Sequence, residues 1–377
     1  MNTKLYLGLD VHKNSIVVAT ALADGSDPQS YGKWCGSNLS AERGLLKIRQ
    51  KYQVEKSEIS IVYEAGPTGF VLARRLQQLG YHCIIVGPSE VPSKAGDKVK
   101  TDKRDARKLA RLHRAGELTA IHIPESKDEA VRDLCRARTD ASQALARAKQ
   151  QLGMFMLRSG YRYDGKTNWT QAHLNYLRRS RMPHPAQQLV LEEYILEVDA
   201  LTQRVARIEE HMREFLPSWE REPYVRALMS FRGFQEVAAM TVISELGDLS
   251  RFKHPRQLMG YLGMVPEESS SGQKRRQGGI TKTGNGHARW MLIECASHYS
   301  HHPRVSPQLS ARQAGQSREV LGIAWKAQNR LNSRFRRLAA RGLHRNKTVV
   351  AIARELCGFL WELHHRVSKE ISGRSAA

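Results

Sequence analysis

Residues 58–86 read EISIVYEAGPTGFVLARRLQQLGYHCIIV. The two ends of this segment, Glu58–Tyr63 and Tyr81–Val86, are apolar runs typical of buried strands, and Thr68–Leu79 between them has helical spacing. Two neighbouring strands that are joined through a helix run parallel, as in a βαβ unit. We therefore expect a partly parallel sheet, and an α/β domain that extends to about residue 120.

The chain before this unit should add antiparallel strands to the same sheet. Lys4–Val11 and Ser15–Leu22 have strand patterns, and Asp24-Gly25 after them is a hairpin-type turn signal. Tyr31–Cys35 is a possible third strand, and Ala41–Tyr52 has the pattern of a helix. The N-terminal domain, residues 1–120, is thus predicted to open with a hairpin and to close with parallel strands.

Residues 121–221 carry no strand signals and should form long helices. The two predicted helices are Asp128–Leu157 and Pro185–Leu216. Apolar positions of the second recur at steps of three and four, which fits a coiled-coil seam and equally an ordinary bundle helix. Between them lies an aromatic stretch, Tyr161–Trp169, whose rings could stack on bases or pack against the helices.

Residues 222–377 are expected to form a mainly helical C-terminal domain. Two short helices, Val225–Ser230 and Glu236–Leu246, flank a tight turn whose backbone amides could bind a phosphate. Gly263–Gly286 shows neither helix nor strand periodicity and should be a loop. The remaining predicted helices are Arg256–Leu262, His287–Ser300, Arg318–Arg341 and Thr348–Ile371.

The charge of the chain indicates a polyanionic partner. Its 377 residues have a formal net charge of +23, from 60 Lys and Arg against 37 Asp and Glu. Nucleic acid fits this excess better than a membrane, because no terminus has the pattern of an amphipathic anchor. No apolar run is long enough to span a bilayer, and the N-terminus lacks a signal peptide's apolar core. The five cysteines are scattered without metal-site spacing, which fits reduced thiols in a cytoplasmic protein.

Two carboxylates lie in a strongly basic stretch, Lys100–Ala106, which reads KTDKRDA. If it is helical, Asp102 and Asp105 continue into the apolar stripe of Leu109 and Leu112, on the side that should face the core. Buried like charges repel, so a divalent cation is the obvious neutralising partner. The alternative is an ordinary helix start, with acids in a first turn that suits the helix dipole.

Asp10 and Glu64 are two further acids, each at the carboxyl end of a predicted strand. Open α/β sheets place their sites at such ends, although either acid alone is also typical of an ordinary strand end. Four carboxylates without a nearby Cys or His ligand favour a hard cation, Mg²⁺ or Mn²⁺. Two such ions can stabilise the attacking and leaving oxygens of a phosphodiester displacement.

Three motifs resemble those of the DEDD insertion-sequence transposases, which are related to the Piv and MooV invertases. They are Gly8–Lys13 (GLDVHK), Tyr63–Gly66 (YEAG) and Lys100–Ala106 (KTDKRDA). The resemblance implies a RuvC-like, ribonuclease-H-like fold for residues 1–120. It also implies that the catalytic metal ligands are Asp10, Glu64, Asp102 and Asp105.

The C-terminal domain is similar to the second domain of the same family. The similarity lies in Tyr261–Pro266 (YLGMVP) and Gly278–Asn285 (GGITKTGN). It implies a recombinase guided by a structured bridge RNA, in which a serine of this loop attacks the DNA phosphate. The family's Ser-Gly pair falls on Ser271-Gly272, with Ser270 as the alternative nucleophile. Without the resemblance, the serine run is typical of a flexible loop.

Basic residues near both sites should contact the nucleic-acid backbone. Some follow the acid pair, some surround the glycines of the serine loop, and some recur along one face of the acid-free stretch Trp325–Lys347. The residues expected to bind nucleic acid are Lys103, Arg104, Arg107, Lys274, Arg275, Arg276, Lys282, Arg330, Arg334 and Arg337.

The sequence therefore predicts an insertion-sequence transposase that cuts and rejoins DNA. The expected mechanism forms a 5′-phosphoserine on Ser271, with Mg²⁺ (or Mn²⁺) held by the four carboxylates. The expected partners are DNA, a bridge RNA and further copies of the chain, as a dimer or tetramer on DNA in a prokaryotic cytoplasm. One alternative is a RuvC-like resolvase or invertase that uses metal-activated water. Another is a non-catalytic nucleic-acid-binding protein, which would explain the charge but not the four acids.

Overall fold

The computed structural model describes residues 3–92, 101–269 and 276–375, and it divides into two compact units, residues 1–124 and 125–377. The long helices expected over residues 121–221 pack within the second unit. No helix of the described residues is long and apolar enough to cross a membrane.

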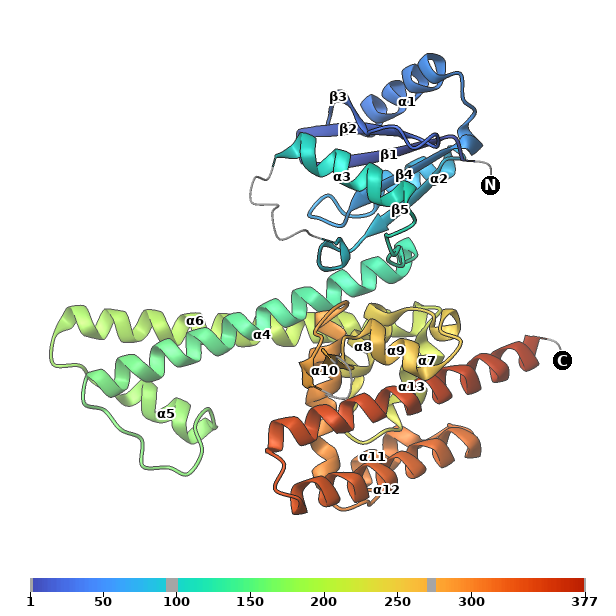
Figure 1. Cartoon of the computed structure of the whole chain (residues 1–377). Helices are drawn as coiled ribbons and strands as arrows, with labels where there is room; N and C mark the ends of the chain where they lie inside the picture. The colour runs from blue at the N-terminus through green and yellow to red at the C-terminus, as the bar shows by residue number, and fades with distance from the viewer. Residues whose placement is uncertain (1–2, 93–100, 270–275, 376–377) are drawn as a thin grey trace. The chain divides into compact units, whose positions relative to one another are not determined.

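The first unit is built on a five-stranded mixed sheet (Figure 1). Its strands are β1 (Leu5–Val11), β2 (Ser15–Leu22), β3 (Gln29–Cys35), β4 (Ile59–Glu64) and β5 (His82–Val86). They lie in the order β3-β2-β1-β4-β5, with the first three antiparallel and the pairs β1–β4 and β4–β5 parallel. The mixed α/β sheet predicted from residues 58–86 is confirmed.

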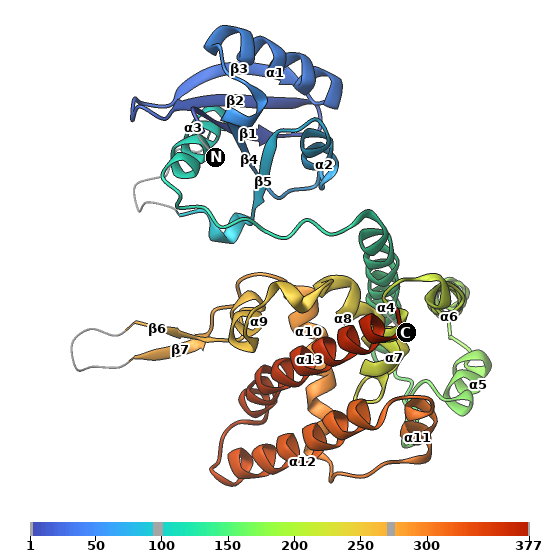
Figure 2. The ribbon, with the colours of Figure 1, turned by 90° about the vertical axis from the view of Figure 1, so that its right-hand side faces the viewer.

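Three helices cover this sheet: α1 (Asn38–Tyr52), α2 (Val71–Gln78) and α3 (Asp102–Arg114). On one face, the alternate side chains Leu5, Leu7 and Leu9 of β1 are fully buried among apolar residues of α1 and α2. On the other face, α3 packs across β1, β2 and β4 through small residues such as Ala106 and Ala110 (Figure 2). The strand alternation of β1 thus puts Asp10 on the face that α3 covers.

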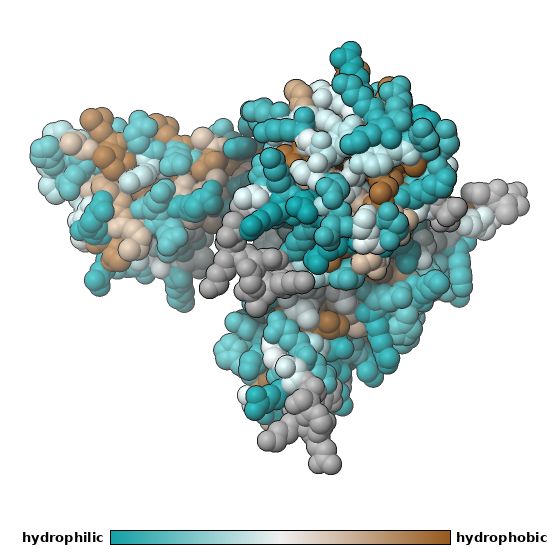
Figure 3. Space-filling view, turned by 45° about the horizontal axis from the view of Figure 1, so that its top comes forward, coloured by the Kyte–Doolittle hydropathy of each residue, from teal (hydrophilic) through white to brown (hydrophobic). Residues whose placement is uncertain are grey.

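A long helical hairpin begins the second unit. It consists of α4 (Ser126–Arg158) and α6 (Pro185–Phe215), which pack side by side in opposite directions. Leu191 and Val198 of α6 are buried against the C-terminal half of α4, so the seam expected on α6 pairs with α4 of the same chain. Figure 3 shows apolar residues still gathered on the outer end of this hairpin. The large exposed ones there are Met154, Leu157, Leu189, Val190 and Leu196.

The rest of the second unit is a helical core. Its helices are α7 (Glu222–Met229), α8 (Glu236–Leu246), α9 (Pro255–Tyr261), α10 (Gly286–Ala296), α11 (Pro307–Gln313), α12 (Arg318–Ala340) and α13 (Arg345–Ser375). The long α13 contacts α7, α9, α10 and α12, and its buried residues share one apolar cluster with theirs (Figure 2).

Three elements were not expected from the sequence. Residues 159–184 contain a helix, α5 (Gln171–Arg179), and α11 precedes α12. The expected loop Gly263–Gly286 contains a two-stranded ribbon of β6 (Pro266–Glu268) and β7 (Gln277–Ile280). The longest of these elements has nine residues, so each contains too few positions to show a periodic pattern.

The aromatic stretch packs within the protein. The rings of Tyr163 and Trp169 contact His173 of α5 at centroid distances of 4.8 and 5.1 Å. Of the two roles considered for this stretch, packing against the helices is the one that these contacts support.

A buried ion network joins α4, α8 and α10. The Glu245 side chain has no exposed surface, and it accepts hydrogen bonds from Arg136 Nε at 2.7 Å and Asn285 Nδ2 at 2.7 Å. His287 Nδ1 lies 2.8 Å from Glu245 Oε1, the oxygen that also accepts from Arg136 Nε. Burial by itself raises the pKa of Glu245, but the bonds from His287, Arg136 and Asn285 outweigh it and lower the pKa to about 2. Glu245 is therefore a charged structural anchor.

Candidate metal centre and nucleic-acid interface

Asp10 and Glu64 lie at the same end of two parallel strands. The register pairs Leu9 of β1 with Tyr63 of β4, so the next residue along each strand is one of the two acids. Glu64 is the last residue of β4 and is exposed, whereas the Asp10 side chain is 21% exposed. The sheet therefore brings both predicted acids to one edge, as expected for carboxyl ends of parallel strands.

Helix α3 brings the other two predicted acids toward this edge. Thr101 caps the helix, and its side chain accepts a hydrogen bond from the backbone NH of Arg104, so Asp102 and Asp105 occupy the first turn. The prediction that Asp102 and Asp105 lie on the side of α3 that faces the core is only partly correct. The Asp102 side chain is 55% exposed and Asp105 is half-buried, because the buried face of α3 is made by Ala106, Leu109, Ala110 and Leu112. The acids sit at the rim of the site, where a ligand can reach them.

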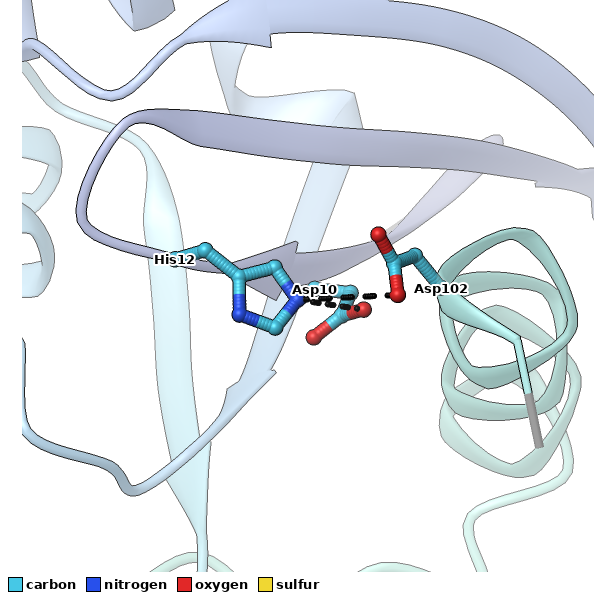
Figure 4. Close-up of side chains that lie close together, drawn as sticks. All are labelled: Asp10, His12 and Asp102. Atoms are coloured by element: carbon cyan, nitrogen blue, oxygen red, sulfur yellow. Dashed lines mark hydrogen bonds and ion pairs between the residues drawn. The ribbon is translucent and has the colours of Figure 1, made fainter.

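His12 is a member of the cluster that the sequence did not reveal. Its Nε2 atom lies 3.1 Å from Asp10 Oδ2 and 3.8 Å from Asp102 Oδ1 (Figure 4). One ligand atom from each of these three residues lies within 4.8 Å of the other two. The prediction of a site without a nearby His ligand is therefore wrong. Side chains two residues apart on a strand lie on the same face, which would place His12 beside Asp10. Because β1 ends at Val11, this alternation was only a weak indication that His12 belongs to the site.

Electrostatic repulsion is built into this cluster. Burial raises the pKa of the Asp10 carboxyl, and the hydrogen bond and charge of His12 lower it. The neighbouring charges of Asp102 and Asp105 raise it again, and the net shift is upward. A hard divalent cation bound beside Asp10 would relieve this repulsion, and carboxylate oxygens are the ligands that such a cation prefers.

The four predicted acids therefore do not all lie in one cluster. Asp10 and Asp102 lie in the three-residue cluster with His12, and Asp105 is close enough to affect the pKa of Asp10. Glu64 lies on the adjoining strand end but is not part of that cluster among the described residues. The predicted nucleophile Ser271, its alternative Ser270, and the basic residues Lys274 and Arg275 lie outside the described residues.

Two of the basic residues predicted near the acids lie at the surface of α3. Lys103 and Arg104 are exposed beside Asp102. Arg107 instead donates from Nε to the backbone oxygen of Pro28 at 2.8 Å, which fastens α3 to the segment before β3. Its charge is not neutralised by that bond, so it still adds to the positive potential of this face.

In the second unit, three of the predicted basic residues share one groove. Lys282, which follows β7, and Arg330 and Arg334 of α12 line a cavity of about 1230 Å³ between the β6–β7 ribbon, α9, α12 and the start of α13. The Glu355 carboxylate forms ion pairs with Arg330 Nε at 2.5 Å and with Arg334 Nε at 3.1 Å. Arg276 and Arg337 are exposed but do not line this groove.

The base of the ribbon is held by close backbone contacts. A Cβ atom on Gly284 would lie 1.9 Å from the backbone oxygen of Tyr261, and one on Gly263 would lie 2.4 Å from that of Thr283. Gly284, one of the glycines of the predicted serine loop, is thus needed for chain packing. These contacts attach the segment that follows β7 to the end of α9.

Comparisons with known proteins agree with these features. Residues 225–312 match a family model described as "Transposase IS116/IS110/IS902 family", and residues 7–159 match the DEDD_Tnp_IS110 model, described as "Transposase". The chain is 43% identical over 360 residues to "Putative transposase y4qE" of Sinorhizobium fredii (strain NBRC 101917 / NGR234), covering 95% of this chain and 88% of that protein. It is 30% identical over 344 residues to "Transposase for insertion sequence element IS1533" of Leptospira borgpetersenii, covering 90% of this chain and 97% of that protein.

Proposed function

Because the chain belongs to the IS116/IS110/IS902 family of transposases, we propose that it cuts and rejoins DNA at a phosphodiester bound beside Asp10 and Asp102. The observation that carries the proposal is the convergence of Asp10, His12 and Asp102 ligand atoms within 4.8 Å at the end of β1. A cluster of acids in a chain of net charge +23 is costly for a protein that only binds a polyanion, because it repels phosphate. The same cluster of acids is useful for a protein that acts on phosphate through a bound cation.

Asp10 and Asp102, with Glu64 and Asp105, would hold Mg²⁺ or Mn²⁺. Oxygen donors of this kind suit both ions, and the bound cation would supply charge stabilisation at the phosphoryl and leaving oxygens. The protein residues fix the geometry: β1 holds Asp10, and the Thr101 cap holds Asp102 in the first turn of α3. His12 Nε2 lies 3.1 Å from the Asp10 carboxylate. Lys103 and Arg104 would meet phosphates that flank the reacting one.

Ser271 is the nucleophile in this proposal. Its hydroxyl oxygen bonds to phosphorus, the bond from phosphorus to the 3′-oxygen breaks, and the hydroxyl proton ends on the released 3′-hydroxyl. The 5′-phosphate stays on the serine, so attack by a new 3′-hydroxyl reverses the step without a nucleotide cofactor. The support is the similarity of the flanking motifs, Tyr261–Pro266 and Gly278–Asn285, and the basic groove into which Lys282 and Arg330 project.

A second candidate uses water in place of Ser271. It is favoured by one observation: Asp10, His12 and Asp102 all belong to residues 1–124, so a hydrolytic site there would need no residue of the second unit. In that case the enzyme would act as a resolvase or invertase with a joining step of different chemistry.

Trapping of a covalent intermediate separates the two candidates. The wild-type protein, with nucleic acid that co-purifies from cells, is denatured during reaction and scored for DNA bound covalently to protein. We expect an adduct that disappears in Ser271→Ala and persists in Ser270→Ala. Cutting by Ser271→Ala without an adduct would identify water as the nucleophile. If the two serine variants give the reverse result, Ser270 is the nucleophile.

The guide RNA and the oligomer are further parts of the proposal. A specific non-coding RNA should co-purify with the wild-type protein, and a two-strand exchange requires at least two serines, hence a dimer or tetramer. Mixed Asp102→Ala and Ser271→Ala chains should regain part of their activity if one site takes residues from two subunits. Activity that stays absent in the mixture would assign both residues to one chain.

A further inference from the structure

A second basic pocket lies in the second unit, away from the groove beside the β6–β7 ribbon. It is a cavity of about 780 Å³ between the turn that joins α7 to α8, the C-terminal half of α10, and the segment that leads into α11. The basic residues of its lining that carry the argument are Arg232, Arg304, Arg312, His298 and His301, and Glu294 is the one carboxylate among the described residues that line it. Arg138 also lines it, but this arginine is bonded to Glu209, from Nε to Oε1 at 2.8 Å.

Three arginines of this pocket have no carboxylate partner among the residues that the structure describes. Arg232 donates from Nη2 to the backbone oxygen of Arg304 at 3.2 Å, and Arg312 donates from Nε to the backbone oxygen of Met229 at 3.1 Å. Such bonds to carbonyls fix the guanidinium groups without neutralising them. In the groove described above, by contrast, Arg330 and Arg334 are both paired with Glu355.

The cations of the pocket repel one another. Burial, and after it the charge of Arg304, lowers the pKa of Arg232. Burial, and after it the charges of His301 and Arg232, lowers the pKa of His298, while Glu294 acts in the opposite direction. An anion that enters the pocket would favour the charged forms of Arg232 and His298, which their positive neighbours disfavour.

The turn that carries Arg232 is rigid. Phe231 and Phe234 on either side of it are fully buried, so both ends of the turn are anchored in the core. Between them Gly233 has a φ of +88°, and a Cβ atom there would lie 2.5 Å from the backbone oxygen of Cys295 in α10. The turn is therefore pressed onto α10 in a conformation that favours glycine. Arg232 is held at a fixed position at the pocket wall.

The first turn of α8 also opens into this pocket. Gln235 is the N-cap residue and makes no side-chain capping bond, and Gln235, Val237 and Ala238 all line the cavity. The first backbone amides of a helix have no helical acceptor and attract an anion, and the residues at the start of this eleven-residue helix line the same cavity as the three arginines. The guanidinium groups and the amides together supply donors of the kind that bind phosphate oxygens.

We propose that the pocket between the Arg232 turn, α10 and the Arg304 segment binds a phosphodiester of a nucleic-acid strand, at a position separate from the site of cutting. This inference rests on the proposed function only for the class of ligand, because DNA and a guide RNA present the same phosphodiester. Bidentate contacts from Arg232 and Arg304 hold the phosphate oxygens, and the α8 amides complete the set of donors. The pocket thereby fixes the register of the strand relative to the second unit.

The test is nucleic-acid binding by the full-length protein at several salt concentrations. The probes are a random-sequence DNA duplex and a random-sequence RNA strand of equal length, each fluorescently labelled. The test variant is Arg232→Gln with Arg304→Gln. The matched control is Arg204→Gln with Arg207→Gln, which removes the same charge from two exposed positions on α6. Thermal unfolding of each variant shows whether a loss of binding reflects a loss of folding. The single variant Arg304→Gln, at an exposed position, is a second check of the same point.

We expect the test variant to bind at least one probe roughly 10-fold more weakly than the control, with a salt slope reduced by about one for each lost phosphate contact. A loss for RNA alone assigns the pocket to the guide strand, and a loss for DNA alone assigns it to the substrate. Equal affinity and slope of test and control variants on both probes would overturn the proposal. The readout is binding and not cutting, so failure of the cutting mechanism would leave this result unchanged.

Discussion

The backbone oxygen of Ala106 in α3 lies directly over Gly8 in β1, at a position 2.1 Å from where a Cβ atom of residue 8 would stand. The backbone nitrogen of Ala110 lies 2.5 Å from the same point. No side chain fits there, so α3 can rest on the strand itself. Because Asp10 is two residues farther along β1 and Asp105 immediately precedes Ala106, this contact sets the separation of the two predicted metal ligands Asp10 and Asp105.

Gly8→Ala should therefore disturb both the fold and the site. Overpacking against backbone atoms costs about 1–3 kcal/mol or more, because neither the strand nor the helix can rotate away from the contact. The measurement is hydrogen exchange of peptides from β1 and α3 in the full chain, with thermal unfolding followed by circular dichroism. We expect faster exchange in α3 and a lower unfolding temperature. Gly66→Ala is the control, since the nearest atom to a Cβ there is 4.0 Å away. Wild-type exchange in Gly8→Ala would show that the contact is not needed.

The cation should bind at the cluster of Asp10, His12 and Asp102. Asp10→Asn and Asp102→Asn each remove one anionic ligand, and we expect each to weaken Mn²⁺ binding by about 10–100-fold or more, as measured by calorimetry. Asp27→Asn removes an exposed carboxylate from the same unit and should bind Mn²⁺ as the wild type does. Undiminished Mn²⁺ affinity in both cluster variants would place the cation elsewhere.

His12 should affect the choice of metal. Imidazole is a better ligand for Ni²⁺ and Zn²⁺ than for Mg²⁺, and Nε2 of His12 is 3.8 Å from Asp102 Oδ1, on the side where a shared ion would lie. His12→Ala is expected to lose affinity for Ni²⁺ while its Mg²⁺ affinity changes less than about threefold. Equal losses for both ions would instead assign His12 the role of orienting Asp10 through the 3.1 Å contact.

The sequence was informative where patterns are long and poor where they are short. Residues 58–86 predicted the parallel strands, because two neighbouring strands that are joined through a helix run parallel. The placement of Asp10 and Glu64 at the same end of the sheet followed from this prediction. The pairing of α6 with α4 and the place of His12 depend on contacts between distant residues, which periodicity does not encode. The inward position of Asp102 was wrong because small alanines, not the acids, make the contact of α3 with β1.

Glu245 should be essential for the stability of the second unit. Glu245→Gln keeps the size of the side chain but removes the charge that pairs with Arg136 and His287, which should cost about 3–5 kcal/mol of unfolding free energy in urea titrations. Glu214→Gln, at an exposed position of α6, is the control. An unfolding midpoint equal to that of the control would contradict the assigned role.

The same network predicts acid sensitivity of the second unit. The pKa of Glu245 is lowered from its ordinary value of 4.5 to about 2 in the folded protein. Its contribution to stability is therefore complete above about pH 4.5, and it is lost as the pH falls toward 2. The difference in unfolding free energy between wild type and Glu245→Gln should shrink over that range. A difference that stays constant between pH 5 and pH 2.5 would contradict it.

The most direct test of the metal site is movement of the insertion element in cells. An element with its natural ends and the wild-type gene is compared with Asp102→Asn, Asp10→Asn and the exposed-site control Asp27→Asn, with protein levels matched by immunoblot. New DNA junctions are counted by sequencing. We predict junctions at the wild-type frequency for Asp27→Asn and a fall of at least about 100-fold for both cluster variants, because a lost ligand removes stabilisation from the transition state. Junctions at wild-type frequency in Asp10→Asn and Asp102→Asn would contradict the account.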